Sequence, residues 1–170
     1  MMTRGLFTAG RTGQTGPVLP GYPISDRELR ALGFSPHDLD VSPIPVPLVG
    51  GLGCSWTTLG DVPDGPGLYA FTVGEVALQH VVYVGLTTHL WMVTKGRLPR
   101  SGGSRPAQRY GRPKYGGETR QRVNILVAAE LAAGRSVRHW LCPTPAESLR
   151  AVEEELICKW RLRELGWNLR

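Results

Sequence analysis

Two apolar runs joined by a short turn constrain the fold of this chain more than any other feature. Residues 68–73 read Leu-Tyr-Ala-Phe-Thr-Val and residues 80–84 read His-Val-Val-Tyr-Val, both rich in aromatic and β-branched types that favour strands. The Gly74-Glu75 pair predicts a turn, so the runs pair as an antiparallel hairpin with a somewhat long loop. Because side chains alternate faces along a strand, Tyr69 and Tyr83 share a face only in a compatible register.

Helical patterns and one further strand surround this hairpin. A capping box at Ser25 and Glu28 starts the first helix, and a second box at Thr144 and Glu147 starts the last. Glycines after the apolar periodicity predict where helices stop. The expected elements are a helix at 25–32, the start of a short helix at 87–93, a helix at 119–133, a strand at 136–142 and a helix closing at Gly166.

Length and composition are those of one globular domain with an appended segment. The chain has 170 residues, 41% hydrophobic and 20% charged, and we divide it into an N-terminal arm with a short helix, residues 1–64, and a domain, residues 65–170. No apolar run approaches the roughly 18 residues of a membrane span, and no signal-peptide core is visible, which predicts a cytoplasmic protein without a membrane partner. The three cysteines are well separated and indicate neither a disulfide framework nor a metal pair.

Positive charge is concentrated in one segment. Residues 86–124 hold nine basic residues and one acidic residue, whereas residues 1–85 hold four basic and seven acidic residues. Such a local excess is expected where a polyanion lies across one face. A solvated basic surface explains the same charge, so the segment alone leaves both readings open.

The order of a few residues narrows the alternatives. Gly67-x-Tyr69 is followed by Tyr83-x-Gly85, then by the arginine-rich segment, and then by Glu153-x-x-Leu156-Ile157 and Asn168. This order resembles the GIY-YIG nuclease family over residues 65–170. The resemblance implies an α/β (α+β) fold, with a three-stranded, mostly antiparallel sheet flanked by helices. It also implies a divalent-metal-dependent DNA endonuclease, with Mg²⁺ or Mn²⁺ as cofactor.

The resemblance assigns catalytic roles to Tyr69, Tyr83, Glu153 and Asn168. The first tyrosine would position or deprotonate the water, helped by the second, although a phenol with its ordinary pKa of about 10 needs a nearby cation to serve as a base. Glu153 lies at the edge of the apolar face of its helix and would hold the metal, whereas Glu154 and Glu155 point towards solvent. Without the resemblance, strand aromatics and a salt bridge from Glu153 to an arginine are the simpler readings.

The catalytic arginine is assigned less directly, because Val93 stands about where relatives carry it. We expect it in the basic insertion, at Arg109, with Arg97 and Arg112 as alternatives. We expect DNA contacts from basic side chains of the same region, namely Arg97, Arg112, Lys114, Arg120 and Arg122. His89 is either a phosphate contact or a helix N-terminal residue. The alternative function is a nucleic-acid-binding module of the same fold that no longer cleaves, and a third reading is a structural or partner-binding protein. The arm has three open roles, namely binding DNA, forming a homodimer and covering the sheet.

Overall fold

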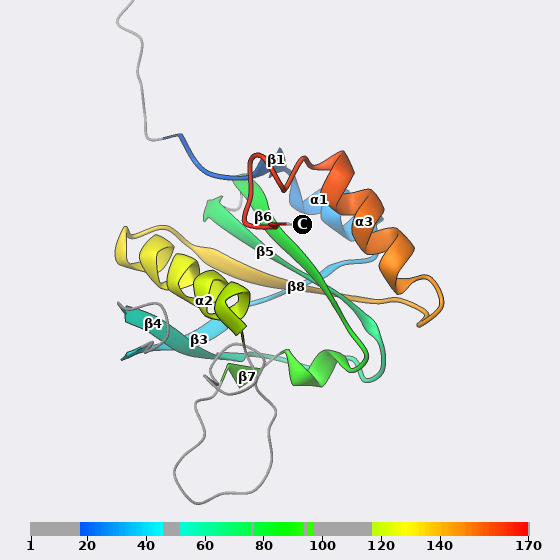
Figure 1. Ribbon diagram of the computed structural model, residues 1–170, viewed down its shortest axis with the longest axis horizontal. Coiled ribbons are helices and arrows are strands. Elements are labelled where there is room, and N and C mark those ends of the chain that lie inside the picture. The colour runs from blue at the N-terminus through cyan, green and yellow to red at the C-terminus, as the bar shows by residue number, and fades with distance from the viewer. Residues whose placement is uncertain (1–17, 46–51, 76, 94, 97–116, 170) are drawn as a thin grey trace, which may run out of the picture.

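A five-stranded sheet forms the centre of the protein (Figure 1). The structure is a computed structural model that describes residues 18–45, 52–75, 77–93, 95–96 and 117–169. The main sheet has, in spatial order, strands β1 (Tyr22–Ile24), β6 (Leu78–Thr87), β5 (Gly67–Glu75), β8 (Val137–Pro143) and β2 (Ser35–His37). A second sheet has the order β3 (Leu39–Pro45), β4 (Leu52–Thr58) and β7 (Lys95–Gly96). All paired strands are antiparallel.

Helices and the second sheet cover the two faces of the main sheet. The helices are α1 (Asp26–Ala31), α2 (Gly117–Ala132) and α3 (Leu149–Lys159), with a 3₁₀ turn, η1 (Leu90–Met92). The first core packs α1 and α3 against one face, through side chains that include Leu29, Ala70, Trp140, Ile157 and Trp160. The second core packs α2, η1 and the second sheet against the other face, through side chains that include Trp56, Phe71, Val123, Val127 and Leu141. Figure 1 shows α1 and α3 on one side of the main sheet and α2 with β3 and β4 on the other.

The expected α/β fold with a mostly antiparallel sheet flanked by helices is confirmed, but the prediction of three strands is wrong. The three expected strands are β5, β6 and β8, the centre of a sheet that β1 and β2 extend at its two edges. Each added strand has three residues, with a proline in the middle, Pro23 or Pro36. Proline cannot donate to a central ladder but is accommodated at an edge, so these short strands carry no alternating signal and read as loops.

Helix boundaries differ where side chains have other partners. α1 has the predicted capping box between Ser25 and Glu28. The predicted box at Thr144 does not start α3, because the Thr144 hydroxyl donates instead to the Cys142 carbonyl at 3.1 Å. α3 also ends before Gly166, since Arg161 has a φ of 50°, outside the helical region. The short helix expected at 87–93 is a 3₁₀ turn, because β6 continues to Thr87.

None of the helices in the described ranges is long and apolar enough to cross a membrane.

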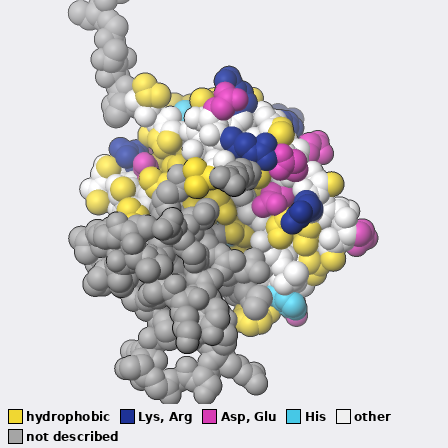
Figure 2. Space-filling model, in the orientation of Figure 1, with side chains coloured by type: hydrophobic (Ala, Val, Ile, Leu, Met, Phe, Trp, Pro, Cys, Tyr) yellow, Lys and Arg dark blue, Asp and Glu magenta, His cyan; other side chains and the backbone are white. Residues whose placement is uncertain are grey.

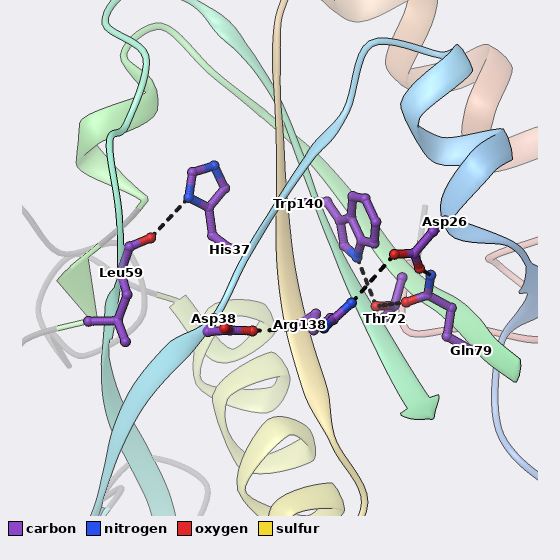
Figure 3. Close-up of polar contacts among 8 residues, drawn as sticks. All are labelled: Asp26, His37, Asp38, Leu59, Thr72, Gln79, Arg138 and Trp140. Atoms are coloured by element: carbon purple, nitrogen blue, oxygen red, sulfur yellow. Dashed lines mark hydrogen bonds and ion pairs between the residues drawn. The ribbon is translucent and has the colours of Figure 1, made fainter. Parts of the chain in front are cut away.

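A chain of polar side chains ties α1 to the main sheet (Figure 3). The Trp140 indole N–H donates to the Thr72 hydroxyl at 2.9 Å, which donates to the Gln79 carbonyl oxygen at 2.8 Å. The Gln79 amide donates to Asp26, the first residue of α1, and Arg138 lies 3.5 Å from the second carboxylate oxygen of Asp26. Thr72 and Gln79 are both 1% exposed. Because buried polar groups are costly without partners, this chain fixes α1 on the first core.

A buried histidine occupies the second core. His139 on β8 is fully buried, with its ring stacked on Phe71 at a centroid distance of 4.7 Å. Its Nδ1 lies 3.0 Å from the Thr58 hydroxyl oxygen, and its Nε2 has no hydrogen-bond partner among the described residues. Burial, with a smaller contribution from the charge of His37, lowers the pKa of His139 to about 3. The folded protein therefore holds this imidazole neutral.

The neutral imidazole makes stability depend on pH. In the unfolded chain His139 binds a proton below about pH 6.5, but in the folded protein only near pH 3, so stability is present above pH 6.5 and lost as the pH falls. From pH 7 to pH 5 we expect this group to remove about 2 kcal/mol of unfolding free energy. His139→Phe should lack this contribution, as measured by urea unfolding at both pH values. His89→Phe, at an exposed position, is the control, and equal pH dependence in wild type and His139→Phe would contradict the assignment.

Candidate functional site

The two tyrosines of the sequence pattern lie next to each other in the second core. Tyr69 on β5 pairs with Gly85 on β6, and Tyr83 lies two residues before Gly85 on the same strand and therefore on the same face. The Tyr69 and Tyr83 ring centroids are 6.0 Å apart. Tyr69 is 3% exposed, whereas Tyr83 is partly exposed. β5 and β6 therefore pair in the register that places Tyr69 and Tyr83 on the same face of the sheet.

Gly85 gives the Tyr69 ring its position. A Cβ atom at Gly85 would lie 2.5 Å from both Cζ and the hydroxyl oxygen of Tyr69, closer than real Cβ contacts come. The ring of Tyr69 therefore crosses over β6 at Gly85, and its hydroxyl group lies above that strand. This contact explains in physical terms why a glycine follows Tyr83 at a spacing of two.

Glu153 reaches β6 from α3. Its side chain is partly buried, and the Leu86 backbone N–H donates to its carboxylate. Burial raises the pKa of Glu153, while the Leu86 hydrogen bond and the charge of Arg150 act in the opposite direction. Glu154 and Glu155 are exposed, as predicted. Among the described residues Glu153 makes no ion pair, which removes the salt-bridge reading within that part of the chain.

The two glutamates that follow Glu153 on α3 lie on the exposed surface of the helix. Figure 2 shows acidic and basic side chains next to one another over this helix. Glu154 pairs with Arg163, and a second pair joins Arg161 to Glu164 just beyond the helix. Exposed pairs of this kind contribute little to stability. Glu153 differs from Glu154 because its carboxylate accepts a hydrogen bond from the backbone of β6, whereas Glu154 forms an ion pair with Arg163.

Asn168 completes the cover of the same strand. Its side chain donates to the Val84 carbonyl at 2.7 Å and accepts from the Val84 N–H at 3.1 Å. The backbone N–H of the preceding residue, Trp167, donates to the Val82 carbonyl at 2.6 Å. Asn168 thus takes the place of a neighbouring strand, and Figure 1 shows the C-terminal segment beside β6. The side chain is 6% exposed.

Four of the predicted catalytic residues therefore meet at one segment, residues 82–86 of β6. Tyr83 belongs to this segment, Tyr69 lies against it on the side of the second core, and Glu153 reaches it from α3, which packs on the first core. Groups from opposite faces of a sheet can meet only at its edge. β1 pairs with β6 only as far as Val81, so residues 82–86 form an edge that these side chains reach. A hydroxyl group and a carboxylate next to one edge could together orient water beside a phosphate.

The side chains of the predicted basic residues lie outside what the structure describes. Arg97, Arg109, Arg112 and Lys114 lie outside the described residues. Arg120 and Arg122 belong to α2, but their side chains are outside what the structure describes. Sequence reasoning missed Arg150, an exposed residue whose charge acts on Glu153. Its position three residues before Glu153 on one helix was the available signal.

The donors at this edge are compatible with Mg²⁺ or Mn²⁺ in a limited way. Within the described ranges no group of three or more His, Cys, Asp or Glu side chains could hold a metal ion. Mg²⁺ is usually held by one or two carboxylates and keeps several waters and substrate phosphate oxygens. Because Glu153 is a partly buried carboxylate that accepts a hydrogen bond from the Leu86 backbone N–H, it has lone pairs left for this mode of binding.

Comparison with protein-family models, with curated proteins and with solved structures finds no match for this chain. The likeness to the GIY-YIG pattern therefore rests on the residues described above.

The close approach of Tyr69 and Gly85 can be tested by a double-mutant cycle. Gly85→Ala places a methyl group where the Tyr69 ring lies, so we expect it to lower the unfolding free energy by about 1–3 kcal/mol. In a Tyr69→Leu background the ring is absent, and the same change should cost much less. Urea unfolding of the four proteins measures both values. If Gly85→Ala cost the same unfolding free energy in both backgrounds, the Tyr69 ring would not be the reason for a glycine at position 85.

The role of Asn168 as a strand substitute can be tested separately. Asn168→Ala leaves the Val84 N–H and carbonyl without these partners, and we expect about 2–4 kcal/mol of destabilisation. Hydrogen exchange of the Val84 amide should become faster. Leu169→Ala, at an exposed neighbour, is the control and should change stability by less than about 0.5 kcal/mol. Unchanged exchange at Val84 in Asn168→Ala would rule out the role.

Proposed function

We propose that this protein is a divalent-metal-dependent DNA endonuclease that hydrolyses phosphodiester bonds, with a domain of the GIY-YIG type. The observation that carries the proposal is the meeting of Tyr69, Tyr83, Glu153 and Asn168 at residues 82–86 of β6. These residues are 99 positions apart in sequence from first to last. A catalytic set requires such a common location, whereas strand and helix residues without a shared role do not.

In this proposal the tyrosine hydroxyl groups orient the water molecule that attacks the phosphate. Tyr69 is held rigidly in the core, with its hydroxyl group above Gly85, so it can accept a hydrogen bond from water at a fixed position. Tyr83 lies beside it on the more exposed side and contributes a second hydroxyl group. Asn168 acts through the backbone, because its two bonds to Val84 fix the strand between the tyrosine and Gly85.

Glu153 is the proposed ligand of Mg²⁺ or Mn²⁺. Such an ion, when bound, supplies positive charge to the phosphate oxygens and lowers the pKa of water. Burial raises the pKa of Glu153, which disfavours the ionised carboxylate when no cation is bound. A nearby cation would favour the ionised form. The Leu86 N–H holds the carboxylate in place and leaves other lone pairs for a ligand.

Arginines provide the remaining charge. Arg109 is the proposed stabiliser of the pentacoordinate phosphate, with Arg97 and Arg112 as alternatives. The proposed contacts to the DNA backbone are Arg97, Arg112, Lys114, Arg120 and Arg122. Guanidinium groups suit the first role because they grip phosphate oxygens bidentately and stay charged.

One observation favours the second candidate, a nucleic-acid-binding module that does not cleave. Val93, near the position where relatives carry their arginine, is 1% exposed and packs in the second core. A charged side chain at that position would be buried, so the arginine must come from elsewhere in the chain if cleavage occurs.

Glu153→Gln separates these candidates. Glutamine can still accept the Leu86 N–H bond but removes the charge, so we expect Mg²⁺-dependent nicking of plasmid DNA to fall by more than about 100-fold. Because the pKa of Glu153 is raised, ionisation opposes folding as the pH rises above its unfolded value, and the variant should be at least as stable as wild type at pH 7. Glu155→Gln, at an exposed site on the same helix, is the matched control and should cleave normally.

Each other result has a defined meaning. Cleavage by Glu153→Gln at the wild-type rate would remove Glu153 from the mechanism. Salt-sensitive DNA binding by the wild type without nicking, in Mg²⁺ and in Mn²⁺, would favour the binding module. Absence of any salt-sensitive DNA affinity would contradict both candidates.

A further inference from the structure

Trp91 is exposed although the protein buries every other tryptophan. Trp56, Trp140, Trp160 and Trp167 are at most 5% exposed, whereas Trp91 is 45% exposed. It lies in η1 between Leu90 and Val93, which are 0% and 1% exposed. In a 3₁₀ turn residues three apart share a face, so Leu90 and Val93 point inward together and Trp91 points away from the core.

The turn that carries Trp91 is fixed to the core. The Leu90 N–H donates to the Gly65 carbonyl at 2.8 Å, and the Leu90 side chain packs where a Cβ of Gly67 would be, 2.7 Å from its Cδ1 atom. The Thr87 hydroxyl donates to the His89 carbonyl at 3.0 Å and accepts from the His89 N–H at 3.2 Å. A ligand that contacts Trp91 would therefore meet a preformed surface and lose little entropy in ordering it.

His89 lies against the indole ring. The two ring centroids are 6.3 Å apart, with planes at 63°. This edge contact orients Trp91 and places two aromatic groups side by side on the surface. We call this pair, His89 and Trp91, the aromatic platform.

The aromatic platform follows directly after the candidate site. Leu86, whose N–H binds Glu153, is five residues before Trp91. Five residues span at most about 17 Å, so the platform lies within a few nucleotides of a phosphate held at Glu153. The chain that continues beyond it, residues 95–114, holds seven basic and no acidic residues. This charge favours a polyanionic ligand over a neutral peptide.

We propose that the aromatic platform stacks an unpaired nucleobase of a DNA strand whose phosphate lies at Glu153. The inference rests on the proposed function for its substrate class and extends it to a base subsite. Aromatic side chains bind single-stranded nucleic acid by stacking, which tolerates any base because every base has a flat face. In a duplex both faces of a base are covered by its neighbours, so the platform favours a frayed, flipped or single-stranded base.

Trp91→Ala and Trp91→Phe test the platform by direct binding. The full-length protein is titrated with a fluorescent single-stranded oligonucleotide of 12 nucleotides in EDTA, which avoids cleavage. We expect Trp91→Ala to weaken binding about tenfold with an unchanged salt dependence, and Trp91→Phe to stay within about threefold of wild type. Leu78→Ala, at an exposed apolar residue at the opposite end of β6, is the matched control and should bind as wild type.

An abasic oligonucleotide of the same length separates stacking from charge. Wild type and Trp91→Ala should bind it equally, since no base remains to stack. Equal binding of the base-containing oligonucleotide by wild type and Trp91→Ala overturns the platform, and so does an equal loss on both oligonucleotides. A dimer that becomes monomeric in Trp91→Ala by sedimentation, with unchanged DNA affinity, also overturns it and makes the surface a protein contact.

The outcome is independent of cleavage. If wild type nicks plasmid DNA but Trp91→Ala binds normally, the platform fails and the nuclease proposal stands. If Trp91→Ala loses base-dependent binding while wild type never cleaves, the platform stands and the nuclease proposal fails.

Discussion

The edge of β6 is the constraint on which much of the structure depends. β1 pairs with this strand only as far as Val81, and the backbone groups beyond it need other partners. Trp167 and Asn168 satisfy Val82 and Val84, and Glu153 satisfies Leu86. One requirement for hydrogen bonds thus determines the path of the chain after α3. It also brings residues that are distant in sequence to the same five-residue stretch of β6.

The same edge joins the two cores. Tyr69 belongs to the core beneath α2, and α3 belongs to the core on the opposite face, so the sheet would separate them at any central strand. Gly85 removes the side chain that would otherwise stop the Tyr69 ring from crossing β6. The glycine of the pattern is therefore a packing requirement, and the position of the hydroxyl group is a consequence of that packing.

Sequence reasoning recovered the elements whose signals are local. The aromatic and β-branched runs of β5 and β6, the capping box at Ser25 and the helical register of Glu153 all follow from neighbouring residues. β1 and β2 were missed because three-residue edge strands with a proline have no period. The contact between Tyr69 and Gly85 and the two bonds of Asn168 depend on register and on the return of the chain, which no local pattern contains.

Among the residues of the GIY-YIG-like order, Glu153 is the one whose chemistry best separates a functional role from a structural one. Gly85 and Asn168 each have a complete packing or hydrogen-bonding reason, so a protein that kept only the fold would still need them. A glutamine at position 153 would accept the same Leu86 N–H without the cost of burying a charge, which is the cost that raises the pKa of Glu153. Local choices that work against stability concentrate at functional sites. The proposed metal binding therefore rests on the carboxylate of Glu153 rather than on Gly85 or Asn168.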